Sequence, residues 1–213
     1  MKPHKFTSAP SAALANAFAS IWLLVGVLAL AFLPGCQNYD QLVDKDQTCE
    51  QKWADYEAQL QRRADLVPNI VATVKASAKH EQDTLAKVTE ARASATGIKL
   101  TGEDFTDPAK MAAFQKAQDQ LKGSLSRLLV ANEAYPELKA NQAFRDLQVQ
   151  LEGTENRILR SREQYNEAVK NYNTELKKVR GQAINKVTGK PFKERVYFTA
   201  SAEAQGPAPK VSF

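Results

Sequence analysis

The sequence predicts an all-α protein whose main domain consists of four long helical segments. The middle of the chain, from about residue 44 to residue 180, is rich in Ala, Leu, Glu, Gln, Lys and Arg, the side chains that lose least freedom in a helix. Apolar residues recur there at intervals of three and four, the spacing of an amphipathic helix. Most of the nine Gly and nine Pro lie near the two ends of the chain. Together these observations predict a single all-α domain.

The composition is that of one ordinary folded domain and does not indicate a nucleic-acid partner. The chain has 213 residues, of which 43% are hydrophobic and 25% are charged. The formal charge is +5, but Lys2 and Lys5 lie in an acid-free N-terminal segment, and without them 27 of the 29 basic residues remain against 24 acidic ones. The predicted helices carry no basic stripe with interleaved aromatic residues. We therefore predict no nucleic-acid partner.

Residues 1–35 have the pattern of an export signal or of a signal-anchor helix. A positively charged start is followed by an unbroken apolar run of 13 residues from Ile21 to Leu33. The run leads into Leu33-Pro34-Gly35-Cys36, which resembles the bacterial lipobox, where cleavage before the cysteine precedes its lipidation. Pro34 departs from the small or apolar residue usual at its position. Cys36 is therefore the candidate lipidation site.

Two interpretations of this segment stay open, and both tether the protein to a membrane on its non-cytoplasmic face, periplasmic or extracellular. In the favoured one, Cys36 is acylated and residues 36–43 form a short polar tether. In the other, residues 12–33 remain as a signal-anchor helix, because 22 residues suffice for the roughly 20 needed to span a bilayer. The predicted membrane contact is thus an N-terminal lipid or an N-terminal helix.

Cys49 is the only other cysteine in the chain. It could not form an internal disulfide once Cys36 is acylated. We interpret Cys49 as an incidental residue on a helix surface. The alternative is a disulfide between two copies of the chain, which would make the protein a homo-oligomer.

The first two helices are predicted to meet at Pro68. One helix begins near Asp44 and leads up to this proline, and a second begins at it and ends before Gly97. Proline suits the first position of a helix and disfavours helix in the preceding residue, Val67. We therefore expect the chain to reverse here. The alternative is a single proline-kinked helix, because proline fixes an angle without by itself reversing a chain.

The third and fourth helices follow the longest non-helical interior stretch. Asp107 is expected to cap the third helix, which runs from Pro108 to Ala134 with heptad spacing of its apolar residues. The fourth runs from Pro136 to Arg180 and either overshoots the other helices or is bent, with Gly153 as its weakest point. The helical domain thus covers residues 44–182, and residues 183–213 are predicted as an irregular, partly disordered tail.

The stripes of the four segments predict which side chains form the core. They are Trp53, Tyr56, Leu60 and Ala64; Val71, Val74, Ala78, Leu85 and Val88; Met111, Phe114, Gln118, Leu121, Leu125, Leu128, Asn132 and Tyr135; and Leu138, Phe144, Leu147, Leu151, Thr154, Ile158, Tyr165, Val169, Tyr172, Leu176 and Val179. Their three- and four-residue spacing places each set on one face of its helix.

Several blocks of the chain resemble the LemA family of bacterial envelope proteins. The first is Arg62-Arg63-Ala64-Asp65-Leu66-Val67-Pro68-Asn69-Ile70-Val71, followed by Thr73-Val74-Lys75, and the others are residues 135–141, 151–158, 165–173 and 208–213. The blocks follow one another in the family's order, and the resemblance as a whole extends over Asn38 to Phe213. The resemblance implies an antiparallel up-and-down four-helix bundle on an N-terminal membrane anchor. It implies no catalytic residue and no cofactor, because the family as known has no established molecular function.

The charged residues beside Pro68 form the first candidate site, together with Asn69. In the functional interpretation, Arg62, Arg63 and Asp65 bind an anion or a partner at a helix N-terminus, where backbone N–H groups are free. In the structural interpretation, they form an ion-pair and capping network that holds the corner. We favour the structural interpretation.

The second candidate site lies on the fourth helix. Glu152 and Glu155, three residues apart, share a helix face and could bind a metal or act as an acid–base pair, with His80 the only histidine of the exported domain. The favoured interpretation is structural instead. In it, Glu152 and Asn156 hydrogen-bond across the core and fix helix register. Their expected partners are Asn132, Asn141 and Gln142.

The function predicted from these residues is that of a membrane-tethered interaction or scaffold module of the envelope, with an unknown protein partner. The exported domain has no Gly-x-Ser-x-Gly and no Ser/His/Asp set, so we predict no catalytic activity, no metal and no cofactor. The alternative is a metal-assisted envelope enzyme that uses carboxylates of the fourth helix.

Overall fold

Every element assigned in the computed structural model is helical. The model describes residues 11–77, 82–131, 138, 140–187, 189 and 192–199, and between residues 11 and 38 only the side chain of Trp22. The elements are α1 (Ser11–Ser77), α2 (Gln82–Gly97), the 3₁₀ turn η1 (Gly102–Thr106), α3 (Pro108–Ala131), α5 (Gln142–Lys177) and α6 (Val179–Val187). The prediction of an all-α protein is confirmed for these described residues.

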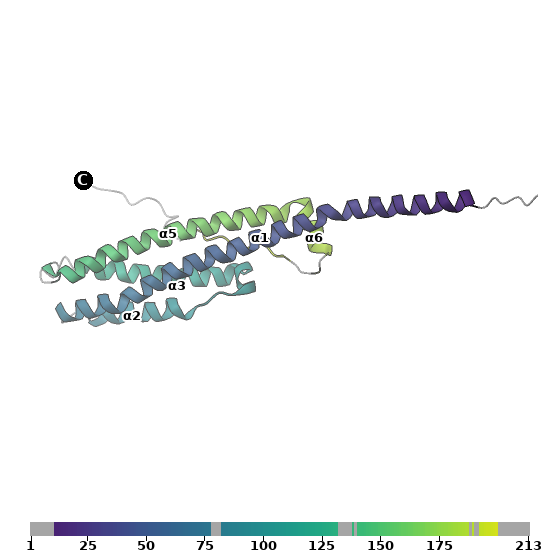
Figure 1. The fold of residues 1–213 in the computed structure, drawn as a ribbon. Helices are drawn as coiled ribbons and strands as arrows, with labels where there is room; N and C mark the ends of the chain where they lie inside the picture. Colours follow the sequence, from purple (N-terminus) through teal and green to yellow (C-terminus); the bar gives the residue numbers. More distant parts are fainter. Residues whose placement is uncertain are drawn as a thin grey trace, which may run out of the picture.

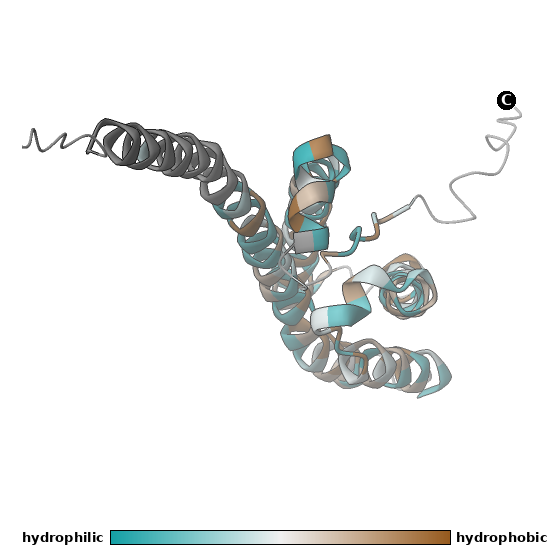
Figure 2. Ribbon diagram, turned by 90° about the vertical axis from the view of Figure 1, so that its right-hand side faces the viewer, coloured by the Kyte–Doolittle hydropathy of each residue, from teal (hydrophilic) through white to brown (hydrophobic). Residues whose placement is uncertain are grey.

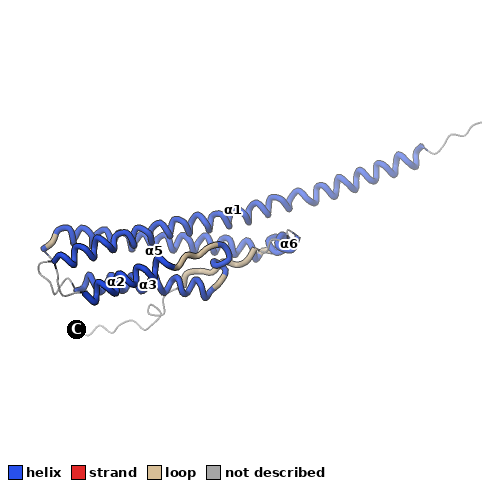
Figure 3. Tube along the Cα trace, turned by 90° about the horizontal axis from the view of Figure 1, so that it is seen from below, coloured by secondary structure: helices blue, strands red, loops and turns tan. Residues whose placement is uncertain are grey.

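The helices α1, α2, α3 and α5 lie side by side and alternate in direction along the chain (Figures 1 and 3). Helix α1 packs mainly against α5, and α2 packs mainly against α3. The N-terminal part of α1 projects far beyond the other helices, and α6 lies beside the start of this projection (Figure 1). Among the described residues, no helix is long and apolar enough to cross a membrane.

The predicted reversal at Pro68 is wrong, because α1 continues through this residue to Ser77. Proline has no N–H, so the carbonyl of Ala64, four residues earlier, lacks its usual helical donor. Arg92 of α2 replaces that donor, and its Nε lies 2.8 Å from the Ala64 oxygen. The alternative of one helix through Pro68 is therefore the observed one, and the direction changes between Ser77 and Gln82.

The predicted start of the first helix near Asp44 is also wrong. Residues 36–43, expected as a polar tether, belong to α1 and contain no Gly or Pro that would end it. Leu42 is fully buried in the core, and the ring of Tyr39 contacts Phe192 with a centroid distance of 6.0 Å. The helix extends because this stretch already contributes apolar side chains to the core.

The fourth predicted helix divides at a different residue from the one expected. Helix α5 runs unbroken through Gly153, and the break comes at Lys178, where ψ is 152°. A Cβ atom at Gly181 would lie 2.5 Å from the carbonyl oxygen of Glu175, so the chain after the break approaches α5 as closely as only glycine allows. Val179, predicted in the core, is 84% exposed because the chain has already turned.

The core has two clusters that follow one another along the helices. The first is aromatic and centres on Trp53, whose ring contacts five others: Tyr56, Phe105, Phe114, Tyr165 and Phe198. We call it the aromatic half. The second, the aliphatic half, contains Leu66, Val67, Ile70, Val74, Leu85, Val88, Ala95, Leu121, Leu125, Leu128, Leu138, Phe144 and Leu151. Hydrophobic and hydrophilic residues are interspersed along each of these helices, as amphipathic helices require (Figure 2).

Most of the predicted core stripe is confirmed by these two clusters. The exceptions among described side chains are Val71 and Leu147, which are half-buried, and Val179. Ala78, Asn132 and Tyr135 lie outside the described residues. The predicted cap of the third helix is also confirmed, because Asp107 Oδ1 accepts the N–H of Ala109 at 2.8 Å.

Candidate functional site

Arg63 is the centre of a buried polar network that joins four helices. The side chain is 2% exposed, and its Nη1 donates to Glu155 Oε1 on α5 at 3.0 Å. Its Nη2 donates to Gln118 Oε1 on α3 at 2.6 Å. Gln118 Nε2 in turn donates to the carbonyl of Ala95 on α2 at 2.9 Å. The network therefore ties α1, α2, α3 and α5 together at one level.

This level is the boundary between the aromatic and the aliphatic half. On α1, Arg63 stands between Leu60 of the first cluster and Leu66 of the second. On α3, Gln118 likewise stands between the residues of the two clusters. A guanidinium that must reach two acceptors on different helices permits only one axial alignment of those helices. The network thus fixes helix register, the role that sequence reasoning gave to other residues.

The other residues of this candidate site face solvent: Arg62, Asp65, Pro68 and Asn69. Asp65 accepts a hydrogen bond from Gln61 on the same helix at 2.7 Å, and the carbonyl of Asn69 accepts from the Thr73 hydroxyl at 2.8 Å. No helix begins here, so the free backbone N–H groups that an anion site requires are absent from this stretch of α1. The predicted ion pair exists, but Arg63 makes it with α5 rather than within a corner.

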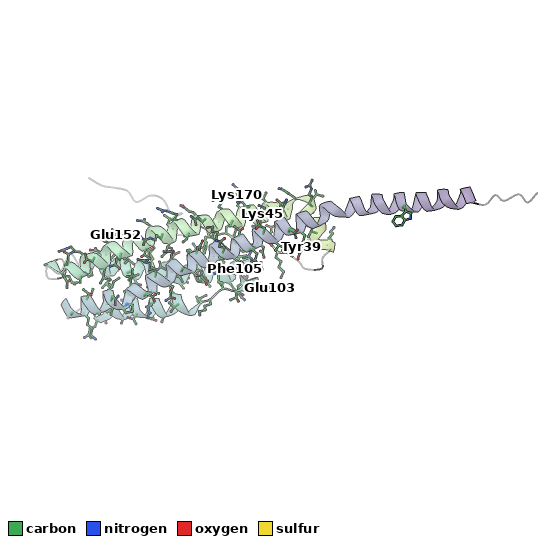
Figure 4. All side chains as sticks on the ribbon, in the orientation of Figure 1. Tyr39, Lys45, Glu103, Phe105, Glu152 and Lys170 are labelled. Atoms are coloured by element: carbon green, nitrogen blue, oxygen red, sulfur yellow. The ribbon has the colours of Figure 1, made fainter. Side chains whose placement is uncertain are left out.

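Glu152 and Asn156 are exposed, so the prediction that they bond across the core is wrong. The inward positions of α5 are Leu151, Thr154 and Ile158, and helical spacing puts residues 152 and 156 outside them. Both residues line an open cleft of about 300 Å³ between α3 and α5. Figure 4 places Glu152 on α5, toward the end of the molecule away from the α1 projection.

The predicted partners of Glu152 and Asn156 have other roles or lie outside the described residues. Asn141 is the N-cap of α5, and its Oδ1 accepts the N–H of Phe144 at 3.3 Å. Gln142 is exposed and donates to Asp146 on the same helix at 2.7 Å. Asn132 lies outside the described part of the chain. Asn141 therefore stabilises a helix end rather than a contact across the core.

The two carboxylates proposed for metal binding, those of Glu152 and Glu155, have different surroundings. Glu155 pairs with Arg63, whereas Glu152 faces solvent. His80, their expected companion, lies outside the described residues. Within the described ranges, no group of three or more His, Cys, Asp or Glu side chains is placed to hold a metal ion.

A second network, which sequence reasoning missed, holds the extended segment Phe192–Thr199 against the helices. Three asparagine side chains act in place of a neighbouring strand: each amide nitrogen donates to the carbonyl of one segment residue, and each Oδ1 accepts its N–H. Asn185 holds Phe192 at 2.9 and 2.6 Å. Asn173 holds Arg195 at 2.9 and 3.0 Å, and Asn166 holds Phe198 at 3.0 and 2.9 Å. We call these three residues the asparagine clamps.

The spacing of the clamps matches an extended chain that runs antiparallel to α5. Asn166 and Asn173 are seven residues apart, two turns of helix, which is about 10.5 Å at 1.5 Å per residue. Arg195 and Phe198 are three residues apart, about 10 Å in an extended chain. A repeated Tyr-Asn pair, residues 165–166 and 172–173, records this spacing in the sequence and could have revealed the clamps.

The side chains of the held segment enter two chemically different sites. Arg195 is 7% exposed, and its Nη2 lies 2.8 Å from Asp46 Oδ1 and 3.4 Å from Glu50 Oε1 on α1. Its guanidinium also lies over the ring of Phe105, 5.2 Å from the centroid. Phe198 stacks on Trp53 with a centroid distance of 5.8 Å. One site is acidic and the other is aromatic.

Cys49 lies beside this acidic site and is fully buried, so its interpretation as a surface residue is wrong. Burial raises the pKa of its thiol to about 11, an effect that the nearby Arg195 opposes only in part. The thiol is therefore protonated at neutral pH, and because it is buried it cannot form the alternative disulfide with a second copy without local unfolding. Burial likewise raises the pKa of Tyr56 to about 12.

Comparison with known proteins gives one positive finding. The model of the LemA family matches residues 52–213 of this chain, which includes the Arg63 network and the asparagine clamps but not Asp46 and Glu50. A search of curated proteins gives no match.

Proposed function

Because this chain belongs to the LemA family, we propose that it is a membrane-tethered helical module of the cell envelope that acts by binding another protein. In this proposal α1, α2, α3 and α5 work as an antiparallel up-and-down four-helix bundle, and the N-terminal segment is its anchor. The observation that carries the proposal is the continuity of α1, which runs from Ser11 to Ser77 without a break.

The continuity of α1 means that the bundle is held without a flexible tether. In the favoured case, acylated Cys36 is the first residue of the mature chain, and Leu42, already in the core, follows six residues later. Six helical residues span about 9 Å, so the bundle sits at the membrane surface. In the signal-anchor case, the same helix is a rigid stalk. Both cases present one end of the bundle to the membrane and leave its sides free for a partner.

The outer face of α5 supports a role in binding. Val149 and Leu159 are large apolar residues that are 68% and 55% exposed, and they lie on one stripe with Glu152 and Asn156 at helical spacing. Mixed apolar and polar side chains of this kind are typical of a transient protein interface. We propose that an envelope protein binds there, so the residues that were candidates for core contacts become candidates for partner contacts.

A photo-crosslinking amino acid at Leu159 of the full-length protein in its own membrane tests the binding role. We expect a discrete adduct with a different protein, and no such adduct from the same reagent at Gln61, an exposed position on α1. Recovery of the monomer alone from both positions, under conditions that trap a known envelope complex, would contradict the proposal. An adduct of two copies would indicate a homo-oligomer instead.

Fractionation with a Cys36→Ser variant tests the tether. The wild-type protein is expected in the membrane fraction, with a mature mass that begins at acylated Cys36. If the lipoprotein interpretation holds, Cys36→Ser keeps residues 1–35, and its N-terminal mass begins at Met1. A wild-type mass that begins at Met1, still in the membrane fraction, supports the signal-anchor. Wild-type protein in the soluble fraction contradicts both.

A further inference from the structure

We propose that the groove holding Phe192–Thr199 is a peptide-binding site for a partner protein, and that the chain's own segment occupies it as an exchangeable substitute. The peptide chemistry that it fits is an extended segment with an aromatic residue, an arginine and an aromatic residue at intervals of three. Phe192, Arg195 and Phe198 have this spacing, and each is held by one asparagine clamp. The inference adds a binding site to the α5 surface proposed above, and it depends neither on that surface nor on the membrane tether.

The clamps recognise the backbone of the segment and not its side chains. Each asparagine bonds both the N–H and the C=O of one residue, which any extended peptide presents in the same way. Further side chains of the helices bond segment carbonyls: the Tyr172 hydroxyl donates to Lys193 at 3.1 Å, and Gln115 donates to Thr199 at 2.7 Å. These side chains can therefore bind the main chain of any extended peptide.

Specificity comes from the two sites that the side chains enter. Asp46 and Glu50 accept the guanidinium of Arg195, and a partner peptide needs a cation at this position. Phe198 stacks on the face of Trp53 with a centroid distance of 5.8 Å and contacts the tilted ring of Tyr56 at 5.0 Å. The combination selects an arginine followed three residues later by an aromatic residue.

The segment lies on the helices without being part of their hydrogen-bonded structure. Its one backbone–backbone bond outside a helix, among described residues, joins Val196 N–H to the carbonyl of Phe105 at 2.8 Å. The acidic and aromatic sites and two of the three clamps are on α1 and α5, which the Arg63–Glu155 pair holds together independently. An empty groove would expose Trp53 and Tyr56 to water, so exchange of one peptide for another is favoured over opening.

A fluorescent peptide that copies residues 191–200 tests the proposal on the full chain. The wild-type protein should bind it weakly, because its own segment competes at an effective concentration on the order of millimolar. Arg195→Glu in the protein places a carboxylate against Asp46 and Glu50 and should release the segment. We expect peptide affinity to rise at least tenfold in fluorescence anisotropy. Arg160→Glu, the same charge change at an exposed position of α5, should leave it unchanged.

Two further variants show whether the gain arises in the groove. Adding Asn173→Ala to Arg195→Glu should abolish it, because the central clamp is lost. A peptide with glutamate in place of arginine should bind at least tenfold more weakly to the Arg195→Glu protein. A folded Arg195→Glu protein that binds the peptide no better than wild type would overturn the proposal.

Hydrogen exchange on the wild-type protein gives a test that does not require any variant to fold. Asn173 and Asn166 protect the amides of Arg195 and Phe198. Excess unlabelled peptide should speed exchange at these two amides, and a scrambled peptide should not. Unchanged exchange at saturating peptide would contradict the inference even if crosslinking at Leu159 succeeds. Accelerated exchange without any crosslink would support the groove and count against the α5 surface.

Discussion

The aromatic and aliphatic halves of the helical core are stabilised in different ways, although they share the same helices. The aliphatic half contains Leu, Val and Ile side chains from α1, α2, α3 and α5, and among its members only Phe144 is aromatic. The aromatic half holds a ring cluster around Trp53, buried Arg195 and an extended segment fixed by asparagine clamps. Volume and apolarity are sufficient for the first kind of core, whereas the second depends on individual polar contacts. The difference predicts different tolerance to mutation.

The largest effect is expected at Arg63, on the boundary of the two halves. Arg63→Ala leaves Glu155 and Gln118 without their partner in a mostly buried place, and loss of one member of such a pair costs about 3–5 kcal/mol. Urea denaturation measures this loss in the free energy of unfolding. Arg62→Ala, its exposed neighbour, should stay within about 0.5 kcal/mol of wild type. Equal losses of stability for the two variants would show that Arg63 does not link the helices.

The second prediction contrasts one buried residue from each half. Asn173→Ala removes both hydrogen bonds to the backbone of Arg195. The buried N–H and C=O of Arg195 are then unpaired, which should lower the free energy of unfolding by about 2–4 kcal/mol. Leu125→Met in the aliphatic half nearly conserves volume and should cost less than about 1.5 kcal/mol. Thermal unfolding of both variants measures the difference. A larger loss for Leu125→Met would show that the halves do not differ as proposed.

The third prediction concerns alkaline pH, which should weaken the aromatic half selectively. Burial raises the pKa of Cys49 from 9.0 to about 11, so the unfolded chain loses this proton first as pH rises. The stability due to the protonated thiol is complete below pH 9 and is lost between about pH 9 and 11. Cys49→Ala should therefore lose less stability over this range, by up to about 2–3 kcal/mol.

Parallel denaturation curves at pH 8, 9, 10 and 11 measure this difference. The buried tyrosines of the aromatic half, among them Tyr56 with its pKa raised to about 12, add to the alkaline loss in both proteins. The contribution of Tyr56 cancels in the comparison, whereas the Cys49 thiolate also raises the pKa of Tyr165 and Tyr172, so part of their loss disappears with the thiol. Identical pH profiles for wild type and Cys49→Ala would show that the Cys49 thiol has the same pKa in the folded and the unfolded protein.

The smallest effect is expected in the aliphatic half, at the proline within α1. Arg92→Ala removes the donor to the Ala64 carbonyl and should cost about 1–2 kcal/mol. In a Pro68→Ala background the restored N–H bonds this carbonyl, so Arg92→Ala should then cost close to nothing. A double-mutant cycle measures the coupling. The same loss in both backgrounds would mean that Arg92 does not replace the missing helical donor.

The local features of the fold could be predicted because their causes lie within a few residues. Asp107 caps α3 through a bond to Ala109, two residues away, and the stripe from Met111 to Leu128 is buried as its heptad spacing indicates. The candidate site was predicted only in part. Arg63 was named, but its partners Gln118 and Glu155 lie 55 and 92 positions away. Such partners are chosen by how the helices align, which no local pattern records.

The same reason explains the predictions that were wrong. Pro68 carries the signal of a helix start, and that signal is overridden by Arg92, which bonds the Ala64 carbonyl from 28 positions away. Gly153 carries the signal of a bend, yet the helix continues because Leu151 and Thr154 are buried in the core on either side of it. Propensity is weak beside the free energy of tertiary packing. Conflicts of this kind are decided by contacts and not by the residue itself.

By itself, the sequence determined that this protein is all-α, which faces of its helices are apolar, and which family it belongs to. These properties follow from side-chain periodicity and from residues read in order along the chain. Only the tertiary structure decided that α1 passes through Pro68, that Arg63 joins four helices, and that Asn166 and Asn173 hold an extended segment. Each of these depends on groups far apart in sequence, such as Asp46 and Arg195 at 149 positions. Their pairing exists only once the helices have aligned and excluded water around them.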